Sequence, residues 1–153
     1  MPLTEIESVT GLAGLVGREV AVSDWVEVSQ GRIEQFAEAT GDHQWIHTDP
    51  ERAARESPFG AAVAHGFLTL SLLSELARTA LAAGGVRLAV NYGLNRVRFV
   101  APVTSGSRIR GRFRLAAFKE VGGGVQAAWR VTVEREGDER ICCVAEWLVR
   151  YYV

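Results

Sequence analysis

Apolar and polar residues alternate between Val22 and Val28, and this alternation predicts a first β-strand. The glycine-punctuated segment from Val9 to Val16 precedes it and predicts at most a short helical turn. After the strand we expect an amphipathic helix, because four side chains recur at the i, i+3, i+4, i+7 spacing of one helical face: Ile33, Phe36, Ala37 and Thr40.

Residues with special backbone preferences mark the ends of the early helices. Ser29 suits the N-cap of the first helix, and Gly41 suits the position just after its end, where a left-handed backbone costs glycine little. Asp49 followed by Pro50 predicts a second, short helix that begins with an aspartate cap. Asp42 therefore leaves a helix end and enters a loop whose starting point is well defined.

The longest helical pattern runs from His65 to Ala83 and ends at Gly84-Gly85. Apolar residues surround much of its circumference: Phe67, Leu68, Leu70, Leu72, Leu73, Leu76, Ala77, Ala80 and Leu81. Its only polar line consists of Ser71, Ser74, Glu75 and Arg78. A helix that is apolar on most sides is typical of an element buried in a core, so we expect one long buried helix here.

Strand patterns follow the helix to the end of the chain. They cover residues 86–100, 107–118, 125–133 and 141–151, with turn signals at Gly122-Gly123-Gly124 and Gly137-Asp138. In the second segment, arginines alternate with apolar residues: Arg108, Arg110, Arg112 and Arg114 against Ile109, Phe113 and Leu115. The sequence thus predicts one α+β domain over residues 1–153, an antiparallel sheet wrapped around one helix. Unpaired sheet edges favour a homodimer.

Composition excludes several classes of protein. Hydrophobic residues make up 48% and charged residues 23% of the 153 residues, as in an ordinary globular protein. A net charge of −1 gives no field that favours nucleic acid. No apolar run reaches the length of about 18 residues needed to span a membrane, and no secretory leader is visible. Cys142 and Cys143 are adjacent, which disfavours a disulfide between them; we expect a cytoplasmic protein.

The candidate chemistry lies in two short stretches, Asp42 to His47 and His65-Gly66. A carboxylate and an imidazole just past a helix end suit acid–base chemistry, although Asp42 could equally well cap the loop backbone. His43 and His47 have the i, i+4 spacing of a metal pair, but Gln44 replaces the glutamate of that motif and no third ligand is evident, so we expect no metal. The imidazole of His65 is expected to be structural.

These stretches together resemble the MaoC-like, R-specific enoyl-CoA hydratase family. The resemblance rests on Gly41-Asp42 with His47, on His65-Gly66 opening a helix, and on Arg98-Phe99 followed by Pro102-Val103 and Gly106. It covers about Gly17 to Tyr152 and looks strongest for a branch of small bacterial proteins similar to nodulation protein N and mycobacterial 3-hydroxyacyl-thioester dehydratases. One departure is Gln44-Trp45, where the family more usually carries Asn-Pro.

The resemblance implies the hot-dog fold and reversible addition of water to trans-2-enoyl thioesters of fatty acid metabolism, without metal or bound cofactor. It assigns Asp42 and His47 to catalysis and the backbone N–H of Gly66 to the thioester oxygen. It implies that Ser74 supports the aspartate, that Arg98 meets a phosphate of CoA, and that the acyl chain lies between helix and sheet. CoA and acyl-carrier thioesters both remain possible substrates.

Two other functions stay open at this point. A hot-dog acyl-CoA thioesterase would cleave the thioester, with Glu75 on the central helix as its candidate carboxylate. A non-catalytic acyl-CoA-binding module would keep the pocket and lose turnover, with Gln44 and Trp45 reshaping the loop.

Overall fold

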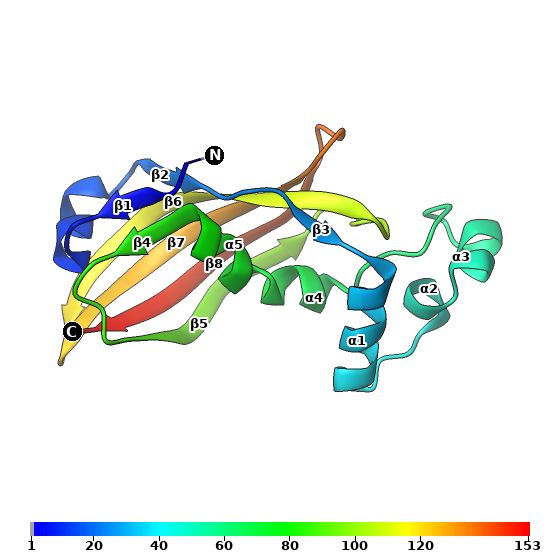
Figure 1. Cartoon of the computed structure of the whole chain (residues 1–153), viewed down its shortest axis with the longest axis horizontal. Helices are drawn as coiled ribbons and strands as arrows, with labels where there is room; N and C mark the ends of the chain where they lie inside the picture. The colour runs from blue at the N-terminus through cyan, green and yellow to red at the C-terminus, as the bar shows by residue number, and fades with distance from the viewer. Residues whose placement is uncertain (1) are drawn as a thin grey trace.

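The computed structural model describes residues 2–153 (Figure 1). Its helical segments are η1 (Val9–Leu15), α1 (Gln30–Thr40), α2 (Trp45–Thr48), α3 (Pro50–Glu56), α4 (Gly66–Ser71) and α5 (Leu73–Ala80). Its strands are β1 (Thr4–Ile6), β2 (Glu19–Val22), β3 (Val26–Val28), β4 (Leu81–Ala83), β5 (Leu88–Phe99), β6 (Ser107–Val121), β7 (Gly124–Arg135) and β8 (Ile141–Tyr152). The long strands form one layer, α4 and α5 lie across one of its faces, and α1, α2 and α3 project from one end.

The main sheet is antiparallel and has the order β2-β6-β7-β8-β5, with β3 also paired to β6. The four long strands predicted from alternation are all present, and this confirms the α+β expectation. Strand β5 pairs only with β8 within the described residues, so its other edge is free. Among those same residues, no helix combines the length and the hydropathy that crossing a membrane requires.

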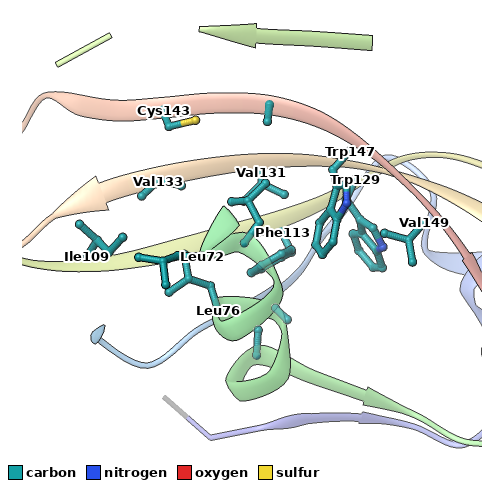
Figure 2. Packing of buried hydrophobic residues seen from close by; sticks show 14 of the residues in the cluster. Leu72, Leu76, Ile109, Phe113, Trp129, Val131, Val133, Cys143, Trp147 and Val149 are labelled. Carbon is teal, nitrogen blue, oxygen red and sulfur yellow. The ribbon is translucent and has the colours of Figure 1, made fainter. Parts of the chain in front are cut away.

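The core fills the space between this sheet and the helix. In Figure 2, Leu72 and Leu76 of the helical segment point toward Phe113, Val131 and their neighbours on the sheet. Phe113 and Trp129 meet edge to face, with ring centroids 6.2 Å apart. Trp129 also satisfies its indole by donating to the Tyr151 hydroxyl at 2.9 Å, as a buried Trp must. The apolar face predicted for β6 is confirmed, since Ile109, Phe113 and Leu115 are all fully buried.

The helix ends form as their local sequence predicts. The Ser29 hydroxyl accepts from the Arg32 N–H at 3.1 Å, and Gly41 closes α1 with φ 78°. Asp49 caps α3 by accepting from the Arg52 N–H at 3.1 Å, with Pro50 as the first helical residue. These contacts place Asp42 at the start of the loop that leads into α2.

Two predictions about element boundaries are wrong. The strand expected over Val22 to Val28 is split into β2 and β3, because Ser23 turns inward and its hydroxyl accepts from the Gly111 N–H at 2.8 Å. The helix expected to reach Ala83 is interrupted at Leu72 and ends at Ala80. The residues after it form β4, which pairs in parallel with β1. This pairing joins segments far apart in the sequence and overrides the local preference of residues 81–83 for helix.

The helix is also less buried than its apolar circumference predicts. Its face toward β5 stays open: Phe67 is 68% exposed, and Ser71 and Ser74 are exposed as well. Several apolar side chains of β5 and the residue after it are exposed in the same region: Leu88, Val90, Tyr92, Leu94, Phe99 and Val100. The chain therefore leaves an apolar surface uncovered along its free sheet edge.

Candidate active site

Asp42 directly follows Gly41, the residue that closes α1. Its carboxylate Oδ1 accepts from the Gln44 N–H at 3.3 Å, and this contact shapes the loop around the aspartate. The side chain remains exposed. The loop-capping role that Asp42 could have from sequence alone is therefore real, and it leaves the other carboxylate oxygen free to act on another group.

His47 lies on α2 and is only 7% exposed. Its Nδ1 is 2.6 Å from the Val63 carbonyl oxygen, which can only accept, so Nδ1 carries the proton and Nε2 keeps a lone pair. Gln30 donates from Nε2 to the His47 carbonyl at 2.8 Å and fixes the backbone. Burial lowers the pKa of His47 below its ordinary value, against the raising effects of the Val63 bond and the Asp42 charge.

His65 lies beside Asp42 and His47 and is 3% exposed. Its Nε2 donates to the Asp42 carbonyl oxygen at 3.0 Å. Its ring stacks on the ring of His47, with centroids 3.8 Å apart and planes 22° from parallel. The ring of Phe36 packs beside it at 4.9 Å. Its Nδ1 is buried and has no hydrogen-bond partner within residues 2–153.

Asp42, His47 and His65 each bring one potential ligand atom within 4.8 Å of the others. This is a candidate metal set by distance, but the stacked rings disfavour it, because imidazole lone pairs lie in the ring plane and two nearly parallel planes do not converge on one ion. His43, the other partner considered in the sequence, is exposed and sits 3.8 Å from Glu38. The geometry suits proton transfer through a shared water better than metal binding.

An apolar cavity of about 300 Å³ adjoins His47 and Gly66. Its other lining residues are almost all apolar: Ile46, Phe59, Val63, Ala64, Phe99, Val100, Ala101, Pro102, Val103 and Cys142. Gly66 is the first residue of α4, so its N–H is among the donors that a helix leaves without an internal partner. A Cβ at this position would lie 2.7 Å from the Phe99 ring, so any larger residue here would have to displace that ring.

Ser74 and Arg98 are not brought to this cavity by the described chain. Ser74 lines a separate groove of about 240 Å³ between the helix and β5, together with Leu70, Asn91 and Trp147. Arg98 is exposed and donates from Nη1 to the carbonyl of Val97 at 2.7 Å. The support of Asp42 by Ser74 that the resemblance implies is therefore not made within one copy of the chain.

Other charged candidates from the sequence are engaged elsewhere. Glu75 accepts two hydrogen bonds from Arg78, at 2.9 and 3.1 Å, which also lower the pKa of that carboxyl. On the outer sheet face, Arg110 and Arg112 both pair with Glu134, and Arg108 pairs with Glu136 at 3.0 Å. Three of the four arginines in this line are thus engaged in ion pairs.

Sequence reasoning missed Gln30, Val63 and the part played by His65. The contacts of these residues join segments 16 to 23 positions apart, and neither a glutamine at a helix start nor a lone valine carries a local signal. His65 did stand out beside Gly66, but its bond to the backbone of Asp42 depends on how the loop folds.

A scan against protein families matches residues 12–137 to the MaoC like domain. The chain belongs to this family. The MaoC-like chain is 53% identical over 146 residues to 3-hydroxyacyl-thioester dehydratase Z of Mycobacterium tuberculosis (strain H37Rv), covering 95% of this chain and 96% of that protein. It is 44% identical over 143 residues to nodulation protein N of Rhizobium meliloti, covering 92% and 89%.

A solved structure also resembles this MaoC-like protein. The MaoC-like dehydratase from Rhodospirillum rubrum superposes with a TM-score of 0.75 at 20% sequence identity, over 95% of this chain and 96% of that one. At that identity the likeness speaks to the fold alone, and it confirms the hot-dog fold expected from the motifs.

Proposed function

We propose that this MaoC-like protein is an (R)-specific enoyl-CoA hydratase, equivalently a 3-hydroxyacyl-thioester dehydratase, which adds water reversibly to trans-2-enoyl thioesters. The observation that carries the proposal is the closeness of Asp42 to His47, which lines an apolar cavity together with Gly66. The name of the relative that shares 53% identity over nearly the whole chain supports the same reaction. The reaction uses no cofactor, since water and the thioester supply all reacting atoms.

Asp42 and His47 hold the reacting water. Their polar atoms lie within 4.8 Å, a separation that one water bridges with two ordinary hydrogen bonds. The bare Nε2 of His47 takes a proton from this water as its oxygen bonds to C3 of the substrate. The proton returns to C2, directly or through Asp42, so that water is added in full across the double bond. Groups that move protons in this way contribute about 10²- to 10⁴-fold to a rate.

The backbone N–H of Gly66 stabilises the other end of the reacting system. As the C2=C3 electrons move toward the thioester, its oxygen gains negative charge, and a free donor at the start of α4 faces that charge. Removing one donor of this kind costs about 10²- to 10³-fold in known enzymes. The glycine allows the thioester to approach the backbone closely, once the neighbouring Phe99 ring gives way.

The working species is a homodimer in this proposal. A free edge on β5 and the exposed apolar side chains beside it are a surface that a second copy would cover. The acyl chain follows the open side of the helix, in the groove that contains Ser74 and Asn91. Arg98 is the candidate for contact with a CoA phosphate, because its guanidinium is exposed on β5. Free, buried Cys142 and Cys143 are consistent with the cytoplasm.

The test follows enone absorbance and free thiol together while purified protein acts on trans-2-enoyl-CoAs of graded chain length. The hydratase consumes the enone without releasing thiol and gives the (R)-3-hydroxyacyl product. Release of thiol in step with substrate loss would identify a thioesterase instead, and binding without turnover would identify an acyl-CoA-binding module. Glu38→Gln serves as the matched control for Asp42→Asn, because it neutralises an exposed carboxylate of α1 that lies 3.8 Å from the exposed His43.

A further inference from the structure

We propose that His65 is a positioning residue, which holds the backbone of Asp42 and the ring of His47 in the arrangement that binds the reacting water. This inference rests on the proposed function and adds a residue to its machinery. It goes beyond the structural role that the sequence predicts for the imidazole of His65.

One side chain contacts both members of the pair. The Nε2–H of His65 donates to the carbonyl oxygen of Asp42 at 3.0 Å, across 23 positions of sequence. Its ring covers one face of the His47 ring at 3.8 Å. Asp42 lies in an exposed loop, and the hydrogen bond from buried His65 ties that loop to the interior. Without it, Asp42 would depend on contacts that are local to the loop, with the Thr40 hydroxyl and the Gln44 N–H.

The same residue also connects the pair to Gly66. The carbonyl of His65 accepts from the N–H groups of Leu68 and Thr69, at 3.0 and 3.2 Å, and so starts α4. The adjacent N–H of Gly66 therefore has a fixed relation to the imidazole that holds Asp42. Reacting groups need a placement accurate to about 0.5 Å, and a single rigid residue between the two ends of the site provides it.

Packing alone does not account for an imidazole here. The Nδ1 of His65 is buried without a hydrogen-bond partner in the described chain, and an unpaired buried polar atom reduces stability. A phenylalanine would fill the same space beside Phe36 and His47 without that cost. The N–H of Nε2 is what the phenylalanine would lack, so the hydrogen bond to Asp42 is the property that the imidazole supplies.

The tautomers of His65 and His47 are complementary. His65 has its proton on Nε2, because the partner of that atom is the main-chain carbonyl oxygen of Asp42, which can only accept. His47 has its proton on Nδ1, because the partner of that atom is the carbonyl oxygen of Val63. The titratable groups that act on His47 are Asp42 from the loop after α1 and His65 before α4, and Cys142 from β8 lines the same cavity. His65 disfavours a positive charge on the neighbouring ring, which keeps the lone pair of His47 available.

The experiment compares wild type with His65→Phe, which keeps the ring and loses the donor, and His65→Gln, which keeps a donor and loses the ring. His43→Asn is the control for the kinetics. It also helps to assign the nitrogen-15 spectra, because it removes the signals of one of the three histidines in the chain. We expect His65→Phe to lower kcat about 10- to 100-fold, within the range of a misplaced acid–base group, with KM within about threefold. We expect His65→Gln to recover part of that loss, and the pH profile of kcat/KM to shift in His65→Phe.

A second measurement does not depend on turnover. Nitrogen-15 spectra of ligand-free wild type should show the His65 proton on Nε2, and amide exchange at Gln44 should accelerate in His65→Phe as the Asp42 loop loosens. A His65 proton on Nδ1, or a His65→Phe protein with kcat within threefold of wild type, would overturn the proposal. If His65→Phe does not fold, the proposal is tested by the position of the His65 proton in the wild-type spectrum and by the kcat of His65→Gln. Correct spectra in a protein without hydratase activity would reject the proposed function while leaving the positioning role in place.

Discussion

The imidazole rings of His47 and His65 stack with their centroids 3.8 Å apart, although the two residues belong to different segments of the chain. Each ring donates one N–H to a main-chain carbonyl, of Val63 and of Asp42 respectively. This arrangement decides which nitrogen of His47 can accept a proton, and it brings an exposed carboxylate and a buried base to one point. The predictions below follow from that geometry and from the surfaces around it.

The first prediction concerns the shared water. Asp42→Asn and His47→Ala should each lower kcat by about 10²-fold or more, because each removes one holder of the water. The double variant should cost little beyond the worse single change, since members of one catalytic unit are not additive. Steady-state kinetics with a trans-2-enoyl-CoA, alongside melting curves, provide the measurement. Losses that multiply strictly in the double variant would mean that the two residues serve separate steps.

The second prediction concerns stability and pH. The pKa of His47 in the folded protein is lowered from the ordinary value of 6.5, mainly by burial. Between these two values the unfolded chain binds more protons than the folded one, so stability falls as pH drops below 6.5 toward the folded pKa. The melting temperature of wild type should therefore decline over this window more steeply than that of His47→Gln. The exposed His43→Gln variant should follow wild type; if it matches His47→Gln instead, burial of His47 is not the cause.

The third prediction concerns the glycine at the start of α4. Gly66→Ala should lower both activity and melting temperature, because the new Cβ would lie 2.7 Å from the Phe99 ring. Overpacking of this kind costs about 1–3 kcal/mol, or roughly 2–12 °C of melting temperature in a chain of this size. Gly14→Ala is the control, since its Cβ would meet nothing within 4 Å. Phe99→Leu should restore part of the melting temperature in the Gly66→Ala background. If it restores none, the strain does not come from the contact with the Phe99 ring.

The fourth prediction concerns the free edge of the sheet. Wild type should sediment as a dimer or a multiple of one, because β5 exposes an unpaired edge beside apolar side chains. Leu94→Lys, on the strand and 43% exposed, should shift the protein toward the monomer, whereas a charge at Val153, which is 60% exposed at the chain end, should not. Light scattering over a range of concentrations checks both. A wild-type monomer at micromolar concentration would contradict the homodimer.

Local chemistry accounts for what the sequence predicts correctly. Ser29 and Gly41 delimit α1 through contacts within a few residues, and the long strands follow from alternation that needs no knowledge of partners. The break at Ser23 depends on Gly111, 88 positions away, and strand β4 depends on β1. No local pattern carries such information, so these boundaries were missed.

The candidate site also contains residues that the sequence identifies and residues that only the three-dimensional structure reveals. Asp42, His47 and Gly66 stand out by spacing and by their family resemblance. The fold brings His47 and Gly66 to one cavity and puts Asp42 within 4.8 Å of His47. Ser74 was transferred by resemblance alone, and within one chain it lines a different groove. A role for Ser74 toward Asp42 therefore stays a prediction, whereas the contact from His65 to Asp42 could only be seen in three dimensions.

The parallel pairing of β1 with β4 has a practical consequence for handling the protein. Strand β1 leads directly into Val9 and Leu12, which are fully buried, so the first residues hold a segment that seals one end of the core. Removing the residues before position 13, to improve crystals or to add a fusion, would expose that end of the core and leave the whole of β4 without its partner strand. An affinity tag, a fluorophore or a surface linker is better attached after Val153, whose side chain is already in solvent.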